Sequence, residues 1–406
     1  MTARGDRGTD ERRAPRPHPC PWAGAEPGSG LRHVGGYEAA RTVLRSRGAT
    51  TQAGFTAESI PQGLLARHPI LLSDGPEHDA QRRAAGRFFS PSRVDAQYAR
   101  LMDDLADRLV GDAVRKGGCR PEELALHYAV GVTREAVGLT HAPLPAMSRR
   151  LEGFLRQPPF DLARPGLGRT RVQWAAAAWR GLVPLARFHV CDVLPAVRSR
   201  RRHPRADLVS HLIAEGCSRT EILVECVTYA TAGMITTREF AVMALWHLLE
   251  RPELADRFRR ADRTGRLAIL REIIRLEPVV GHLYRRVRRP IHLPEGPDLA
   301  PGDLVDLCVA EANLDPALGP RTTGLEPCRP LPRGAAGGGL SFGAGEHRCP
   351  GEHLALVETA VLLGRILQEG PRLRTPPRVS WDQLVAGYRL RGAVLGFSPS
   401  GSASPR

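Results

Sequence analysis

Hydrophobic positions along most of the chain recur every three or four residues, which is the spacing of helices that pack one face against a core. The first such segment is YEAARTVLRSR, after Gly36. Further helices are predicted over residues 94–114, 149–154, 172–197, 208–215, 219–249, 251–260 and 267–276. Strand-like segments are few and late, namely LVDLCVA from Leu304 and YRLRGAVLGF near the C-terminus. The sequence therefore predicts a mainly α fold with a small β part.

The pattern also predicts how the chain is divided. Residues 1–30 are rich in proline, glycine and charge, so we expect a poorly ordered N-terminal extension. Residues 31–406 contain no convincing linker and no internal repeat, and we expect them to form a single domain.

Composition narrows the class of protein. The chain is 42% hydrophobic and 25% charged, with no apolar run near the roughly 18 residues of a membrane span and no apolar signal-peptide core. We therefore expect a cytoplasmic protein that does not bind membranes. The net charge of +15 comes almost entirely from arginine, since Lys116 is the one lysine, and this bias is typical of a GC-rich genome. Because no aromatic residues interleave the arginines, the sequence does not favour nucleic-acid binding.

Candidate chemistry is concentrated in a glycine-rich loop near the C-terminus, which reads FGAGEHRCPG from Phe342 to Gly351. Its cysteine, Cys349, immediately precedes an apolar run that is predicted to be helical. Backbone N–H groups and the positive end of that helix would favour a thiolate and lower the pKa of Cys349. Gly343, Gly345 and Gly351 have no Cβ, so the backbone can take unusual angles and approach a flat ligand. This arrangement suits an axial thiolate ligand of haem iron.

The loop resembles the haem-binding loop of the cytochrome P-450 haem-thiolate monooxygenases, at Phe342, Gly343, Gly345, His347, Cys349 and Gly351. The resemblance implies the single-domain cytochrome P-450 fold of the bacterial, actinobacterial-like type. It also implies haem b (iron protoporphyrin IX), with Cys349 as the metal ligand. The haem would lie between the long oxygen-side helix and the helix that follows the cysteine loop.

Further motifs match the family's haem propionate contacts. His78 and Arg82 fall at i and i+4 on one helix face, although read alone they would be an exposed helix start. The resemblance assigns both to a propionate, together with His347. In the strand-like segment after Pro278, only Arg285 or Arg286 can point toward the haem, because neighbouring strand residues face opposite sides. The alternation of later apolar residues favours Arg285.

Glu272 and Arg275 form a Glu-x-x-Arg motif that resembles the ion pair beneath the haem in this family. We expect it to have a structural role. The family usually adds an arginine from a proline-rich segment, and here that segment departs from the usual pattern. Arg321 and Arg329 are both candidates.

The segment Thr231–Thr237 resembles the oxygen-activating part of the family's long helix. Ala232 and Gly233 would lie over the haem, and Thr236 matches the threonine that assists proton delivery. The residue before that threonine is commonly acidic, but here it is Ile235, which cannot relay a proton. Glu239, Thr237, ordered water or a substrate group could supply the path, and Glu239 could equally be a solvated surface residue.

These features predict a monooxygenase that inserts one oxygen atom from O2 into a small apolar or natural-product substrate, in secondary metabolism. Electrons would come from a separate ferredoxin or flavodoxin-type donor, for which a basic surface patch is suitable. Two alternatives remain: an atypical oxidative coupling or peroxide-driven reaction, motivated by Ile235, and a non-catalytic haem sensor. Residues 49–69 and 149–179 would contain the pocket, with these apolar candidates: Phe55, Ile60, Leu64, Phe154 and Phe160.

Overall fold

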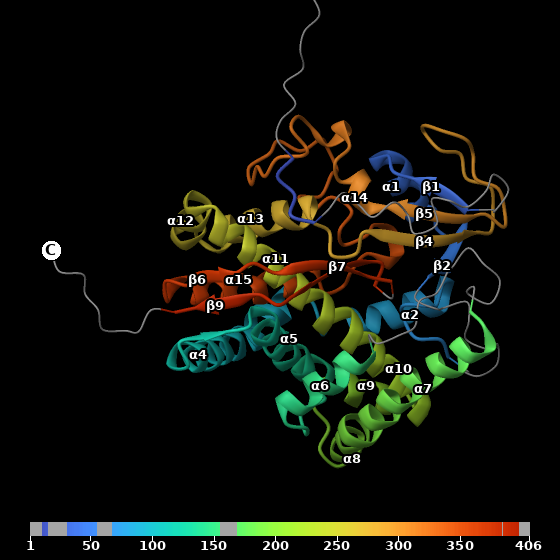
Figure 1. Ribbon diagram of the computed structural model, residues 1–406. Helices are drawn as coiled ribbons and strands as arrows, with labels where there is room; N and C mark the ends of the chain where they lie inside the picture. The colour runs from blue at the N-terminus through green and yellow to red at the C-terminus, as the bar shows by residue number, and fades with distance from the viewer. Residues whose placement is uncertain (1–9, 15–30, 55–66, 155–168, 384, 398–406) are drawn as a thin grey trace, which may run out of the picture.

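A computed structural model describes residues 10–14, 31–54, 67–154, 169–383 and 385–397 of the chain. Helices dominate this part, as the hydrophobic pattern predicts. No described helix has the length and apolar character needed to cross a membrane. In Figure 1 the four-stranded sheet lies at the upper right and helices α6–α9 lie at the bottom, with α11 passing between them.

The first helices are α1 (Tyr37–Arg45), α2 (Gly75–Gly86), α3 (Pro91–Arg93), α4 (Ala99–Arg115), α5 (Pro121–Val137), α6 (Leu144–Phe154), α7 (Arg171–Phe188) and α8 (Leu194–Arg202). They are followed by α9 (Leu208–Ala214), α10 (Arg219–Tyr229), α11 (Thr236–Glu250), α12 (Pro252–Arg260), α13 (Arg263–Leu276), α14 (Val309–Ala312) and α15 (Glu352–Gln368). Short π-helical turns, such as Ala230–Ile235, interrupt three of the predicted helical runs without ending them.

The strands form three small sheets. The first contains β1 (Leu31–Val34), β5 (Leu304–Cys308), β4 (His282–Val287) and β2 (Thr50–Ala53), in that order. The second contains β3 (Gly118–Cys119), β9 (Val394–Gly396) and β6 (Arg372–Thr375), and the third pairs β7 (Arg378–Asp382) with β8 (Gly387–Arg391). β5 contains the predicted segment from Leu304, and β8 and β9 contain the predicted C-terminal segment. β4 contains the strand-like segment after Pro278 and leads away from α13 toward the candidate site.

The main core surrounds α5, which the hydrophobic pattern did not predict as a helix. Thirteen of its seventeen residues are buried, so it has apolar residues on all sides and little amphipathic contrast. Gly131 faces Leu105 of α4 so closely that a Cβ would collide with the leucine. Buried helices of this kind give a weak periodic signal, which explains the omission.

Residues 10–14 lie within the segment predicted to be poorly ordered, yet they contact the rest of the chain. The Glu11 backbone N–H donates to the Thr323 carbonyl at 3.1 Å, and Arg13 pairs with Glu250 at 2.6 Å. Charged residues of this short segment therefore find partners on α11 and on the loop around Thr323.

Candidate functional site

The cysteine loop is held by its own backbone. The Cys349 N–H donates to the Phe342 carbonyl at 2.8 Å, which closes the loop just before α15. Gly343 and Gly345 both have φ near +69°, and a Cβ on Gly345 would collide with the Leu44 carbonyl oxygen. Gly351 has an ordinary φ of −92°, so its expected unusual angle is absent. Glycine is required at the first two positions by conformation and close approach.

The electrostatic surroundings of Cys349 differ from the sequence-based expectation. Burial raises the pKa of the thiol, and the Gly351 N–H and the Arg82 charge lower it by less. The expected net lowering of the pKa is therefore wrong for the protein alone. A thiolate at this half-buried position needs a positive charge directly on its sulfur, and a metal ion provides one.

Several of the predicted propionate contacts come together beside this loop. The His78 and His347 rings lie 4.2 Å apart, centroid to centroid. Arg82 donates to the Arg348 carbonyl, one residue before Cys349. Arg285 is buried in β4, and its guanidinium donates to the Tyr284 carbonyl at 2.8 Å. Arg286, on the opposite side of the strand, donates to the Gly302 carbonyl instead.

The cluster contains more basic than acidic partners. His347 donates to or accepts from Asp74 at 2.9 Å, and Glu346 lies 3.6 Å from Arg47. Burial lowers the pKa of Arg285 to about 10, and burial together with the charges of His347 and Arg82 lowers that of His78 to about 4. The His78 Nδ1 is buried, and none of the residues that the structure describes hydrogen-bonds to it.

These basic groups, next to a cysteine whose thiolate needs a positive partner, fit a ligand that combines carboxylates with a metal. Haem b has that chemistry, with two propionates and an iron atom. His78, Arg82, Arg285 and His347 are the residues that could hold the propionates, and Cys349 is the residue that could bind the iron.

The oxygen-side helix is continuous from α10 through the π-helical turn Ala230–Ile235 into α11. Ala232 is exposed and Thr236 half-buried, although Met234, Ile235 and Thr237 beside them are buried. One face of a core helix thus opens onto free space at the predicted oxygen-binding position. The Thr236 hydroxyl donates to the Ala232 carbonyl, which leaves its oxygen as an acceptor.

Helix packing also explains why position 233 is a glycine. A Cβ on this residue would lie 3.3 Å from the Thr133 methyl group of α5, which is tighter than ordinary van der Waals contact. The mid-helix glycine therefore allows α5 and the oxygen-side helix to approach closely.

The structure does not bring Glu239 to Thr236. The Glu239 carboxylate is buried and accepts from the Leu390 N–H at 2.8 Å, from Arg391 at 2.8 Å and from Arg238 at 2.9 Å. An acid held by two arginines and a backbone N–H is a packing element between α11 and β8, so the hypothesis that it replaces the missing acid is not supported.

Thr237 points to another acid. Its side chain hydrogen-bonds Glu358 of α15, a fully buried carboxyl group whose pKa burial raises well above its usual range. Burial disfavours the charged form of such a carboxyl group.

Glu272 and Arg275 form a bidentate ion pair, with both N–O distances at 2.8 Å. Arg275 also donates to the carbonyl groups of Asn313, Thr322 and Gly324. Arg329 joins the pair, 3.1 Å from Glu272, whereas Arg321 is exposed and pairs with Glu326. The structure thus distinguishes the two candidate arginines and favours Arg329.

Two polar residues of α10 that lie in the core were not predicted from the sequence as candidate site residues. One Glu225 oxygen accepts the Ile70 N–H at 2.9 Å, and the other has no hydrogen-bond partner among the described residues. Burial raises the Glu225 pKa to about 7. Within the described part of the chain, the Tyr229 hydroxyl is also buried without a hydrogen-bond partner, and its ring stacks on Phe89 at 5.3 Å. The signal that could have revealed them is a polar residue at a core position of an apolar helical run.

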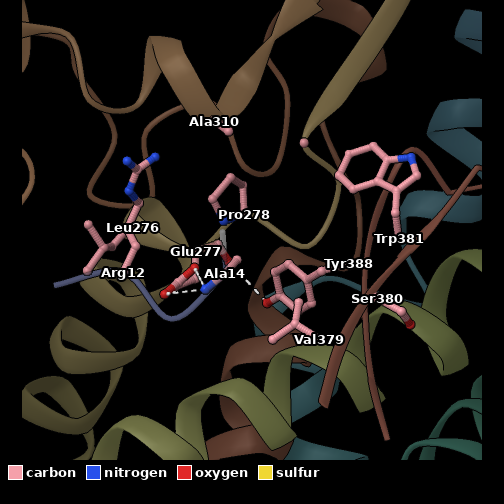
Figure 2. A pocket seen from close by; sticks show the side chains of 11 residues that line it. Arg12, Ala14, Leu276, Glu277, Pro278, Ala310, Val379, Ser380, Trp381 and Tyr388 are labelled. Carbon is pink, nitrogen blue, oxygen red and sulfur yellow. Dashed lines mark hydrogen bonds between the residues drawn. The ribbon is translucent and has the colours of Figure 1, made fainter. Parts of the chain in front are cut away.

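A separate cavity of about 290 Å³ lies between residues 12–14, the end of α13 and the β7–β8 hairpin. Figure 2 shows Tyr388 and Pro278 at its centre, with the Tyr388 hydroxyl donating to the Glu277 carbonyl at 3.1 Å. None of the predicted site residues lines this cavity.

Of the apolar pocket candidates, Phe55, Ile60, Leu64 and Phe160 lie outside the described residues, and the structure does not describe the side chain of Phe154.

Comparisons with known proteins agree with this site. Residues 267–370 match the family model "Cytochrome P450". The chain is 26% identical over 356 residues to "Cytochrome P450-SOY" of Streptomyces griseus, covering 84% of this chain and 79% of that protein. It is 27% identical over 402 residues to "Erythromycin C-12 hydroxylase" of Saccharopolyspora erythraea, covering 92% and 91%.

Among solved structures, the fold is similar to that of CalO2, with a TM-score of 0.75, 25% identity and 91% of each chain covered. The matched segment contains the Glu272–Arg275 pair and the cysteine loop, and the similarity to relatives extends over most of the chain. The chain belongs to the cytochrome P450 family, its cofactor is haem b, and it is a P450 monooxygenase.

Proposed function

We propose that this P450 inserts one oxygen atom from O2 into a natural product of secondary metabolism, using electrons from a separate ferredoxin or flavodoxin-type donor. This proposal is supported by three features together: the half-buried Cys349, a cluster of basic groups with few acidic partners among the described residues, and an accessible helix face at Ala232 and Thr236. The similarity to a hydroxylase of erythromycin supports the substrate class.

Haem held by a thiolate supplies O2 binding and O–O bond cleavage when electrons and protons reach it. The residues of this chain would do the rest. Arg82, Arg285, His78 and His347 would fix the cofactor through its carboxylates. Thr236, whose proton is donated to the Ala232 carbonyl, would accept a hydrogen bond at the oxygen side and hold a proton donor there. Because Ile235 carries no acid and Glu239 is bound by two arginines, Thr237 and the buried carboxyl group of Glu358 are our candidates for the proton path.

The test of the threonine's role compares Thr236→Ala with Thr228→Ala. Thr228 donates to the Val224 carbonyl in the same way, two turns earlier on the helix, and is the matched control. With a substrate found by its spectral shift, Thr236→Ala should lower product formed per reductant consumed by about tenfold or more. Equal coupling in both variants, with haem content unchanged, would show that Thr236 does not assist proton delivery.

Ile235 also favours a second candidate, a peroxide-driven or oxidative coupling reaction that depends little on an acid at this position. Product formation with hydrogen peroxide that exceeds the ferredoxin-driven rate would favour this reaction. Tight coupling of ferredoxin-derived electrons to hydroxylated product would rule it out.

A further inference from the structure

Helix α7 exposes an unusual amount of apolar surface. Val172 is 79% exposed, Trp179 is 72% exposed and Leu182 is 62% exposed. Val190, just beyond the helix, is 60% exposed. Two of the helix residues, Ala177 and Phe188, are buried. A surface helix normally buries its apolar face, but α7 exposes large apolar side chains to solvent.

The exposed residues form a regular line. Val172, Ala175, Trp179, Leu182 and Ala186 are all exposed and are spaced by three, four, three and four residues. This is the heptad spacing of a helix-packing seam, and we call these five residues the α7 seam. The seam lies on the side of the helix opposite the buried Ala177 and Phe188. Figure 1 places α7 at the edge of the molecule, where a partner can reach it.

The charged side chains of α7 around the seam are all positive. Arg171, Arg180 and Arg187 are exposed beside it, and none of them pairs with a carboxylate among the described residues. Helix α7 contains no aspartate or glutamate, and α8 adds further exposed arginines, Arg198, Arg201 and Arg202. Two copies of this chain joined at the seam would bring like charges together, which disfavours self-association.

We propose that the α7 seam is a docking surface for an acidic helical protein that presents an apolar helix face to it. Apolar residues of such a partner would pack between Val172, Trp179 and Leu182, and its carboxylates would pair with Arg180 and Arg187. Ala175 and Ala186 favour this over an anionic membrane, because alanine contributes little apolar area to a bilayer but lets another helix approach closely.

The test uses the full haem-loaded chain and two synthetic helical peptides with leucine at a and d positions, one flanked by glutamate and one by lysine. The glutamate peptide should bind, detected by fluorescence anisotropy, and the lysine peptide should not. Replacing both Trp179 and Leu182 by glutamine should weaken binding by more than about tenfold, and Arg180→Glu with Arg187→Glu should do likewise. Leu331→Gln, another exposed apolar residue, is the matched control and should bind normally.

Three outcomes would overturn the proposal. The first is equal binding of both peptides, or of neither. The second is stronger binding to anionic phosphatidylglycerol vesicles than to the glutamate peptide, which would indicate a membrane surface. The third is a concentration-dependent dimer in sedimentation that the Trp179 and Leu182 double variant abolishes, which would indicate a second copy of the chain.

Discussion

Two sets of arginines in the candidate site are treated differently by the fold. Arg275 and Arg329 share the Glu272 carboxylate and several backbone carbonyls. Arg285 forms no ion pair with a described residue, and Arg82 also forms none among them. Because an unpaired buried charge is costly, the first group is complete for folding, whereas the second is complete only with an anionic ligand.

The largest expected effect comes from breaking the complete group. Glu272→Gln would leave Arg275 and Arg329 without a carboxylate in a buried site. We expect the free energy of unfolding to fall by about 3–5 kcal/mol, measured by denaturant unfolding. Glu326→Gln, which removes the more exposed partner of Arg321, should cost less than about 1 kcal/mol. Similar losses of stability in the two variants would contradict the claim that Glu272 completes a buried ion-pair group.

Glu225 extends the comparison to a buried acid, one of whose carboxylate oxygens has no hydrogen-bond partner among the described residues. Its pKa in the folded protein is raised from 4.5 to about 7, mainly by burial. Between these values the folded state binds more protons than the unfolded state, so stability falls as pH rises, by roughly 3 kcal/mol in total. Glu225→Gln should therefore match the wild type near pH 4 and become more stable than it above pH 7. Parallel pH profiles of stability for the two proteins would show that Glu225 is not strained.

The smallest stability effect is expected at Arg285. Arg285→Leu removes an unpaired buried cation, so the haem-free protein should become more stable by about 1–2 kcal/mol, while haem is lost faster to a competing haem-binding protein. Arg286→Leu, its neighbour on the other side of β4, is the control and should retain haem. Equal destabilisation of the haem-free and haem-loaded forms by Arg285→Leu would mean that Arg285 serves folding alone.

Much of this arrangement could be predicted from the sequence where a motif fixes the spacing. The helix containing Glu272 and Arg275, the cysteine loop and the strand containing Arg285 were each predicted from local patterns. Helix α5 was missed because burial on all its sides removes the amphipathic period. The π-helical turn at Ala230–Ile235 leaves no mark on that period either.

The partners of the charged side chains were harder to predict than the helices and strands that contain them. The local sequence does not distinguish Arg329 from Arg321. The difference is that the folded chain brings Arg329 to Glu272, whereas Arg321 pairs with Glu326. Likewise, one-turn spacing suggested Glu239 as a proton donor, but Arg238, Arg391 and β8 bind its carboxylate. The pKa of Cys349 was predicted in the wrong direction because burial outweighs the N–H groups that a sequence can suggest.

The most direct test of the central claim is the absorption spectrum of the reduced, purified protein exposed to carbon monoxide. Thiolate ligation by Cys349 predicts a strongly red-shifted Soret band that is absent in Cys349→Ala. Cys308→Ala, at a buried cysteine elsewhere in the chain, is the control and should keep the band. A well-folded protein with a histidine-type spectrum, or a Cys349→Ala variant that keeps the red-shifted band, would contradict the account.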